Sequence, residues 1–245
     1  MYHFFVQHEN IFDDSIIIDG DDVNHIKNVL RMKVGEQVLL SSGDNYDYLC
    51  EIDNIDDNRV VSRIIEKKEN TNELPCKVYL FQGLPKADKM ELIIQKTVEL
   101  GIFEIIPVAM KRCVVKLDDK KSKSKVERWQ AISESAAKQS KRSIIPSISN
   151  VMTYKQALEY AKSLDVLLLP YECADGIEYT RKCINDIKPG QSVGIFVGPE
   201  GGFELDEVEA GIAAGCKEIT LGKRILRTET VGMMMMSVLS YNLEE

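Results

Sequence analysis

The last fifty residues repeat one local pattern twice, and this repeat constrains the fold more than any other feature of the chain. An apolar run, VGIFVG (residues 193–198), ends in glycine and is followed by the turn PEGG and a helical pattern. The run EITLG (residues 218–222), the loop KRILRTET (residues 223–230) and an apolar helix over residues 231–243 then follow. Strand, glycine loop and helix in succession predict a parallel sheet flanked by helices, with ligands at the carboxyl ends of the strands.

The first of these helices carries signals at both ends. We expect it to begin near Leu205, because Leu205, Val208 and Ile212 share one face of a helix. Glu204 stands at the N-cap, where Ser or Asp is preferred, and Gly215 can supply the left-handed stop.

The two glycine loops do not match the common nucleotide-binding motifs. GPEGG is neither GxxxxGK[ST] nor GxGxxG, so a triphosphate site is not expected. Adjacent glycines let a ligand approach the backbone, although a double-glycine turn can also be only a turn. In the second loop Arg227 and Glu229 stand between apolar residues, where a packed core would favour neither charge. They are either functional residues or an intraloop ion pair beside helix-capping threonines.

The ordered combination of GPEGGF, an acidic helix and LGKRILRTET resembles the signature of the SPOUT-class methyltransferases, and among them the 16S ribosomal RNA (uracil-N3) methyltransferase family. The upstream pieces HIKNVLRMKVGE, KMELIIQKTVELGI, KRCVV, SAAKQSKR and LLLPYE occur in the family's order, so the resemblance spans nearly the whole chain. It implies an α/β methyltransferase domain with a parallel sheet and a trefoil knot, preceded by a small PUA-like β-barrel. It also implies S-adenosyl-L-methionine as cofactor, a homodimer, and 16S ribosomal RNA or the small ribosomal subunit as partner.

One segment departs from the family pattern. The run VGMMMM (residues 231–236) replaces the alanine-rich segment that the family has after TET. Methionines can fill irregular gaps, so a core-packed helix is still expected, with altered packing at the knot or dimer face.

We expect the cofactor to be held mainly by backbone groups of three loops at strand ends. Main-chain N–H and C=O groups can read the polar edge of adenine while aliphatic side chains cover its faces. The residues expected to bind it are Leu169, Pro170, Tyr171, Gly198, Glu200, Gly201, Leu221, Gly222, Ile225 and Leu226.

Arg227 and Glu229 are the candidate catalytic residues. Uracil N3 carries a proton and is a poor nucleophile until that proton leaves, so the reaction needs a base or a cation. Glu229 is the candidate base if burial strengthens its affinity for a proton, and Arg227 would stabilise negative charge on the uracil oxygens. The alternative is a structural ion pair between them that only shapes the cofactor loop.

Charge divides the chain into two segments. Residues 1–72 contain 7 Lys and Arg against 15 Asp and Glu, whereas residues 73–245 contain 24 of each sign. The polar linker KKENTNELPC (residues 67–76) contains the proline that is typical of a domain joint. We therefore predict a PUA-like RNA-binding domain over residues 1–72 and a methyltransferase domain over residues 73–245.

The first segment contains strand-like runs around one short helix. YHFFV, EQVLLSS, YDYLCEI and NRVVSRIIE have the composition of strands, and Gly43, Asp44 and Asn45 mark a turn. Asp21 or Asp22 can cap the helix DVNHIKNVL. The resemblance places His25, Arg31 and Gly35 on family motif positions and makes Arg31 a candidate RNA contact. A packed or capping histidine, and an arginine paired with a carboxylate, remain the alternatives.

In the second segment KVYLFQGL predicts the first strand, and Pro85 suits the first turn of the next helix. Met90, Ile93, Ile94 and Val98 form the apolar stripe of that helix. The helical pattern near residues 153–162, the run DVLLLPYE and the helical pattern near residues 179–187 continue the alternation.

Residues 111–142 form a basic patch in an acidic protein, with 11 Lys and Arg against 4 Asp and Glu. We expect residues 111–128 to be a loop too charged to be buried. Such a run is typical of a solvated face, but it contains Trp129, the only tryptophan, and its helix ends in the family's QSxR. The candidate RNA contacts here are Arg112, Lys120, Lys121, Lys123, Gln139, Ser140 and Arg142.

Other classes of protein are not favoured. The six cysteines have no CxxC spacing and the three histidines lie near the amino terminus, so neither a metal site nor a disulfide framework is expected. The sequence shows no basic leader and no apolar run near the roughly 18 residues that cross a membrane. We expect a cytoplasmic protein.

Three functions are consistent with these features. The first is an RNA uracil-N3 methyltransferase. The second is a SPOUT enzyme that acts on transfer RNA or another base position, because the glycine loops report the cofactor and not the base. The third is a non-catalytic RNA-binding ribosome-assembly factor, which the presence of Arg227 and Glu229 disfavours.

Overall fold

The structure, a computed structural model, describes residues 1–43, 46–69, 72–172, 174 and 176–244. It contains two compact units, one of Met1–Glu73 with Ala137–Ile145 and one of Leu74–Ala136 with Pro146–Glu245. The segment Ala137–Ile145 thus groups with the amino-terminal unit, which the predicted boundary after residue 72 did not include. Asp44, Asn45 and Cys173 lie outside the described residues.

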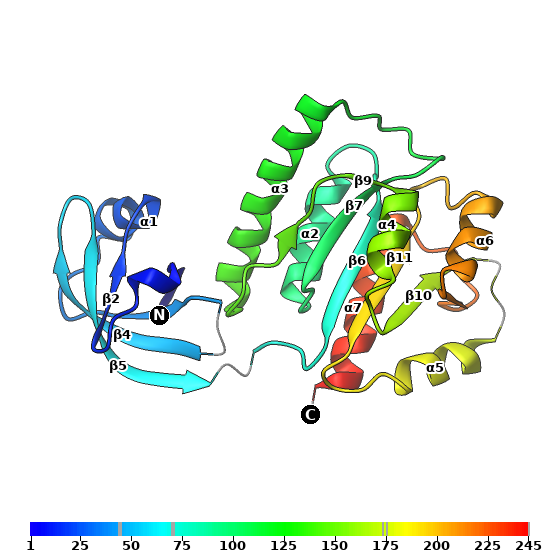
Figure 1. The fold of residues 1–245 in the computed structure, drawn as a ribbon. Helices are drawn as coiled ribbons and strands as arrows, with labels where there is room; N and C mark the ends of the chain where they lie inside the picture. The colour runs from blue at the N-terminus through cyan, green and yellow to red at the C-terminus, as the bar shows by residue number, and fades with distance from the viewer. Residues whose placement is uncertain (44–45, 70–71, 173, 175, 245) are drawn as a thin grey trace. The chain divides into compact units, whose positions relative to one another are not determined.

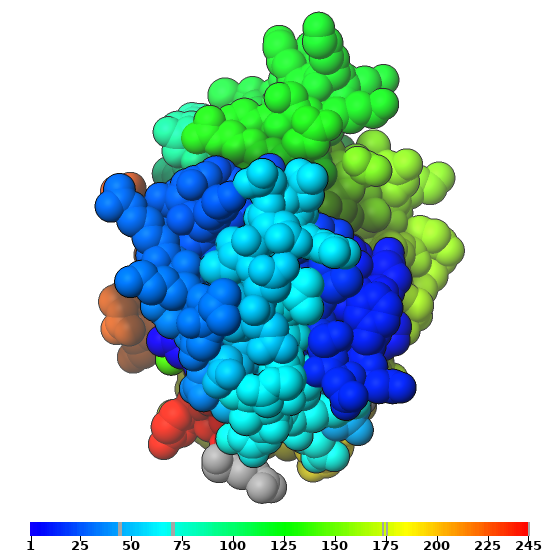
Figure 2. All heavy atoms as spheres, turned by 90° about the vertical axis from the view of Figure 1, so that its left-hand side faces the viewer, coloured from blue at the N-terminus to red at the C-terminus, as the bar shows by residue number. Residues whose placement is uncertain are grey.

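A five-stranded sheet in the order β1-β3-β4-β5-β2 forms the amino-terminal unit (Figure 1). Its strands are β1 (Tyr2–Phe5), β2 (Ser15–Ile18), β3 (Gln37–Ser41), β4 (Tyr46–Ile55) and β5 (Val60–Glu69). All pairs are antiparallel except β1 with β3. Figure 2 shows one face of this unit, along which the cyan region of β5 runs between darker blue amino-terminal segments.

The core of this unit comes from alternate residues of the strands. Ile16 and Ile18 of β2, Val38 and Leu40 of β3, and Ile52 of β4 are 0–1% exposed. This alternation is the period-2 pattern of a sheet with one buried face. The unit is the PUA-like β domain, although strand β2 was not predicted from the sequence.

The helical segments of this unit are short. They are η1 (His8–Asn10), α1 (Asp21–Asn24) and the π-helical turn η2 (His25–Val29). The N-cap of α1 is Gly20, with φ of +66°, and Asp21 and Asp22 occupy the first turn. The prediction that one of these aspartates caps the helix was therefore wrong.

The second unit contains a parallel sheet in the order β12-β10-β11-β6-β7-β8, with β9 also paired to β7. Its strands are β6 (Lys77–Gly83), β7 (Glu104–Ala109), β8 (Ser147–Ile148), β9 (Met152–Thr153), β10 (Val166–Pro170), β11 (Ser192–Val197) and β12 (Lys217–Ile219). Its helices are α2 (Lys89–Glu99), α4 (Tyr154–Ala161), α5 (Ile177–Asn185), α6 (Leu205–Ala213) and α7 (Thr228–Leu243). Helix α3 (Asp119–Ser140) begins in this unit. The predicted parallel α/β domain is confirmed.

Helices cover both faces of this sheet. Gly232 of α7 packs against Leu80 of β6, where an added Cβ would lie 3.3 Å from the leucine Cδ2. The next residue, Phe81, stacks on Phe196 at 4.3 Å and meets Tyr160 of α4 at 5.9 Å between ring centroids. Successive strand residues point to opposite faces, so α7 and α4 lie on opposite sides of β6.

Three predicted details of the helices were wrong. Helix α2 begins at Lys89 and not near Pro85, although its apolar stripe is buried as expected. Residues 119–128 belong to helix α3 and not to a loop. Trp129 is only 4% exposed, so it packs in the core instead of standing in the basic surface.

Helix α6 buries a different face from the one its apolar residues suggested. Leu205 is 64% and Ile212 is 47% exposed, whereas Glu207, Val208 and Gly211 are buried. A Cβ on Gly211 would lie 2.8 Å from Leu169 Cδ1, so the missing side chain lets α6 approach β10 closely. The Glu207 carboxylate is tolerated there because it accepts hydrogen bonds from the Lys111 and Glu204 N–H groups, each 2.9 Å long.

Candidate active site

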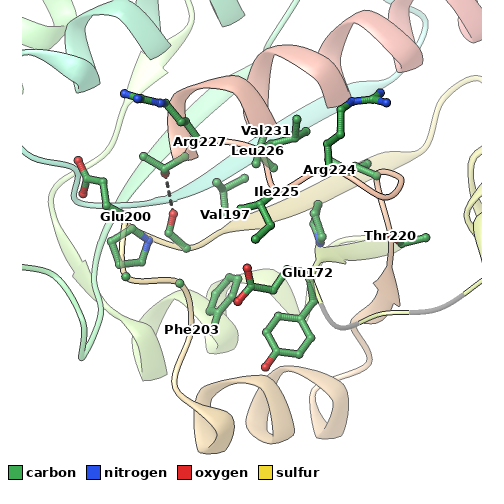
Figure 3. Close-up of a pocket in the computed structure, with 18 of the residues that line it drawn as sticks. Glu172, Val197, Glu200, Phe203, Thr220, Arg224, Ile225, Leu226, Arg227 and Val231 are labelled. Atoms are coloured by element: carbon green, nitrogen blue, oxygen red, sulfur yellow. Dashed lines mark hydrogen bonds between the residues drawn. The ribbon is translucent and has the colours of Figure 1, made fainter.

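The loops that follow β10, β11 and β12 meet because these three strands are neighbours in the parallel sheet. They line an open cavity of about 400 Å³, to which the start of α2 also contributes (Figure 3). Figure 3 shows the Glu172 carboxylate and the aliphatic side chains of Val197 and Ile225 directed toward this space. The cavity therefore combines apolar walls with a carboxylate.

Close backbone packing shapes the loop after β11. A Cβ on Gly83 would lie 2.7 Å from Pro199 N, so β6 and the loop touch through a glycine. A Cβ on Gly198 would lie 3.1 Å from the Gly202 carbonyl carbon, and Gly202 has φ of +70°. Side chains at these positions would clash or strain the turn, so the glycines fix its course.

Arg112 braces the same loop from the segment after β7. Its guanidinium donates to the Gly201 carbonyl at 2.9 Å and to the Glu204 carboxylate at 3.0 Å. The hydrogen bond from Arg112 lowers the pKa of Glu204. A predicted RNA contact is thus already engaged with the loop that borders the cavity.

Thr228, the first residue of α7, joins three segments. Its hydroxyl donates to the Gly198 carbonyl at 2.6 Å and accepts from Gln82 Nε2 at 2.9 Å. Gln82 is fully buried in β6. The hydroxyl therefore locks the second glycine loop to the first and to the central strand.

An ion-pair cluster lies at the cavity edge. Lys89 Nζ is 3.1 Å from Glu200 Oε1 and 3.2 Å from Glu229 Oε2. The Lys86 N–H also donates to Glu200 Oε1 at 3.0 Å. Burial alone would raise the pKa of Glu200, but the hydrogen bonds from Lys86 and Lys89 outweigh it and lower that pKa. The hydrogen bond to Glu200, supported by the one to Glu229, raises the pKa of Lys89.

The structure brings nearly all predicted cofactor residues to this cavity. Leu169 is the exception, because its side chain is fully buried in β10. The predicted residues that line the cavity are Pro170, Tyr171, Gly198, Glu200, Gly201, Leu221, Gly222, Ile225 and Leu226. Ile225, expected to cover the adenine ring, is 82% exposed.

The two candidate catalytic residues lie in different surroundings. Arg227 lines the cavity, but its side chain extends away from Glu172 in Figure 3. Glu229 does not line the cavity, and its side chain is 15% exposed. Its ion-pair partner is Lys89 of α2, so the alternative of an ion pair between Arg227 and Glu229 is not what the structure shows.

Several residues of the cavity were not among the predicted cofactor-binding residues. The charged and polar residues among them are Lys89, Glu172, Thr220, Arg224 and Thr228. Glu172 and Thr228 adjoin predicted residues and could have been included with them. Lys89 carried no such signal, because its partners Glu200 and Glu229 are more than a hundred residues away in sequence.

The residues proposed to bind RNA are dispersed. Lys120, Lys121, Lys123 and Gln139 lie exposed on α3, and Arg31 is exposed in the amino-terminal unit. Ser140 is half-buried, and its hydroxyl contacts the Ala137 carbonyl at 3.4 Å.

Arg142 differs from this group, since it is only 3% exposed and its guanidinium is paired with Glu73. Because its guanidinium is buried and paired with Glu73, we propose a structural role for Arg142 instead of an RNA contact. Ser143, its neighbour, donates to Asp47 Oδ2 at 2.7 Å within the same unit.

Within the described ranges no three His, Cys, Asp or Glu side chains are grouped so as to hold a metal ion. None of the helices in the described part of the chain is long and apolar enough to span a bilayer.

Comparisons with known proteins agree with this architecture. Residues 72–240 match the model of an RNA methyltransferase domain, and residues 18–65 match that of an RNA methyltransferase PUA domain. The chain is 40% identical over 235 residues to the ribosomal RNA small subunit methyltransferase E of Bacillus subtilis, covering 93% of this chain and 90% of that protein.

Two solved structures are also similar. One is a ribosomal RNA small subunit methyltransferase E from Neisseria gonorrhoeae bound to S-adenosyl methionine, with 29% identity and a TM-score of 0.85 over 98% of this chain and 97% of that one. The other is a putative methyltransferase from Legionella pneumophila in complex with S-adenosylmethionine, with 30% identity and a TM-score of 0.83 over the same shares.

Proposed function

We propose that this chain methylates small-subunit ribosomal RNA with S-adenosyl-L-methionine. The chain belongs to the family of RNA methyltransferases that carry an RNA methyltransferase PUA domain. The methylated atom that we propose is N3 of one uridine in 16S ribosomal RNA. The observation that carries the proposal is the convergence of three strand-end loops on one cavity.

The residues of the cavity fit this cofactor. Adenine needs apolar contacts on its faces and hydrogen-bonding groups at its edge. Val197, Leu221, Ile225 and Leu226 supply the first, and the main chain of the loops supplies the second. Glu172 and Glu200 place carboxylates in the same cavity, which suits a ligand with a sulfonium and an ammonium.

When bound, the cofactor would supply a methyl group carried on a sulfonium. Uracil N3 would take the methyl group, and the sulfur would keep the electron pair of the broken S–C bond. Glu229 lies outside the cavity lining, so its carboxylate turns toward the cavity to accept the N3 proton, and the N–H electron pair stays on N3. Arg227 stabilises the negative charge that spreads onto the uracil oxygens. Apolar walls do not oppose the step, since opposite charges disappear in it.

Two surfaces support an RNA substrate. The exposed lysines of α3, Lys120, Lys121 and Lys123, supply positive charge that phosphates attract. Arg31 lies in the unit that matches a PUA domain. Its backbone has a φ of +54°, a conformation that residues other than glycine rarely adopt. We assign both to RNA binding, with Gln139 and Ser140 as further contacts at the end of α3.

We also propose a homodimer with a knotted carboxyl-terminal half. Exposed apolar side chains support the dimer, because Tyr241 of α7 is 92% and Tyr179 of α5 is 48% exposed. The knot rests on membership of the family alone. Action on ribosomal RNA would place the protein in the cytoplasm.

The proposed function can be tested by following the methyl group. The protein is incubated with labelled S-adenosyl-L-methionine and, separately, undermethylated small subunits, free 16S ribosomal RNA and transfer RNA. Digestion and chromatography should give labelled 3-methyluridine from the small subunit or its RNA. Label only in transfer RNA, or in another nucleoside, would contradict the proposal.

A further inference from the structure

Lys89 is shared by two carboxylates that come from different loops. Its ammonium lies 3.1 Å from Glu200 and 3.2 Å from Glu229, and the side chains of these three residues are 29%, 25% and 15% exposed. Lys89 lines the cavity, whereas Glu229 does not line it and reaches its edge through the ion pair with Lys89. The cluster thus combines two negative charges and one positive charge at the edge of the site.

The local structure around Lys89 is unfavourable in two ways. Ala87 has φ of +52°, a left-handed conformation that residues other than glycine rarely adopt. Lys89 is the first residue of α2, where the positive end of the helix dipole disfavours a cation. Such features persist where the surroundings require them, and they concentrate at functional sites. Here they place Lys89 between Glu200 and Glu229.

The charges of the cluster suit the uptake of one proton. If Lys89 were paired with Glu229 alone, protonation of Glu229 would leave a half-buried ammonium without a counter-charge. Because Glu200 also pairs with Lys89, protonation of Glu229 leaves a neutral pair of Lys89 and Glu200.

We propose that Lys89, Glu200 and Glu229 act as one proton-accepting cluster, in which Lys89 is a positioning residue for the base. Lys89 orients the Glu229 carboxylate, and Glu200 retains Lys89 when Glu229 turns to the cavity and takes the proton. The N3–H bond breaks with its electron pair left on N3, and the proton bonds to a Glu229 oxygen. This inference rests on the proposed methylation of uracil N3.

Three neighbouring segments bring charged groups to this edge of the cavity. Lys89 comes from α2, Glu200 from the loop after β11, and Arg227 from the loop that leads into α7. Arg227 also lines the cavity, but the cation paired with Glu229 is Lys89.

The test measures kcat against pH at saturating cofactor and RNA for the wild type and four variants. In Lys89→Met the two carboxylates face each other without a cation, so the acidic limb of the profile should move to higher pH by about one unit or more. In Glu200→Gln the base faces an ammonium alone, so the limb should move to lower pH and the plateau should fall roughly tenfold. Lys89→Arg should keep the limb of the wild type.

Lys162→Met is the matched control. Lys162 forms an exposed ion pair with Glu159 on α4, so its loss should leave the profile unchanged. If the acidic limbs of the pH profiles of Lys89→Met and Glu200→Gln coincide with that of the wild type, the proposed cluster is overturned, even if both variants are slower. If Lys89→Met does not fold by circular dichroism, the direction of the Glu200→Gln shift decides alone.

The test separates this inference from the proposed function. A wild-type protein that methylates no uracil N3 contradicts the function. A wild-type protein that does so, with unmoved limbs in the variants, contradicts only the cluster.

Discussion

At the scale of single residues, Glu229 is the group on which the proposed chemistry depends most. Glu229→Gln preserves the shape of the side chain and removes its ability to accept a proton. We expect near-normal cofactor binding and a methylation rate lower by roughly 10²-fold or more at neutral pH. Partial recovery is expected at alkaline pH, where less catalysis of proton removal is needed.

Single-turnover rates across pH, with calorimetry for the cofactor, check this prediction. A Gln variant that methylates at the full rate at neutral pH would exclude Glu229 as the base. A variant that no longer binds cofactor would instead support a purely structural role for this side chain.

Gly201 tests the cofactor loop at the same scale. Even a Cβ at this position would lie 3.0 Å from Arg112 Cβ, so valine must push the loop or Arg112 aside. We expect Gly201→Val to abolish measurable cofactor binding while the protein remains folded. Calorimetry that gives an unchanged affinity would show that this loop does not hold the cofactor.

Arg142 supports the structure of the amino-terminal unit. Its buried guanidinium pairs with Glu73, which also accepts from the Ser143 N–H at 2.9 Å. Arg142→Met leaves a partly buried carboxylate without its cation, so we expect a loss on the order of 3 kcal/mol in the free energy of unfolding of this unit. Urea denaturation checks it. A variant of unchanged stability that binds RNA less tightly would restore Arg142 as an RNA contact.

At the scale of whole elements, helix α3 is where electrostatic binding of RNA can be measured. Replacing Lys120, Lys121 and Lys123 by Gln should weaken binding and flatten its dependence on salt, because each phosphate contact contributes to the slope. The control removes three exposed lysines elsewhere, Lys155, Lys162 and Lys182. If both triple variants keep the wild-type affinity and slope, α3 is only a solvated helix.

The local sequence pattern predicted the helices and strands well, but it predicted less well which of their faces are buried. The run at residues 193–198 and the repeat after it gave β11, α6 and α7 because glycine turns bound strongly periodic segments. The buried face of α6 was not predicted correctly because it includes Gly211, which has no side chain and so allows close packing. A pattern of apolar residues does not reveal such a contact.

Contacts between segments that are distant in the sequence could not be predicted from the local sequence pattern either. The sequence indicated the three glycine and aliphatic loops, but not that β6 lies beside β11 and brings Lys89 to Glu200 and Glu229. Likewise, the QSxR motif looked basic and exposed. Only the structure shows that Arg142 is buried against Glu73.

At the scale of the whole molecule, the proposed dimer rests on exposed apolar residues of the second unit. Tyr241 of α7, Tyr179 and Ile177 of α5, and Ile225 of the cofactor loop are 92%, 48%, 42% and 82% exposed. Exposed apolar patches of sufficient size are typical of an interface. A second copy of the chain would remove them from water and exclude solvent near the cavity.

We therefore expect a dimer, and we expect Tyr241→Asp to shift it toward monomer, because a charge at the interface must be desolvated. Light scattering coupled to size exclusion measures the mass, and Phe12→Asp, at a 51% exposed aromatic residue of the first unit, is the control. Methylation should fall with the dimer fraction if the second copy completes the cofactor site at Ile225. A wild-type protein that is fully active as a strict monomer would refute the dimer. A monomeric Tyr241→Asp variant of full activity would refute only the role of the second copy in the site.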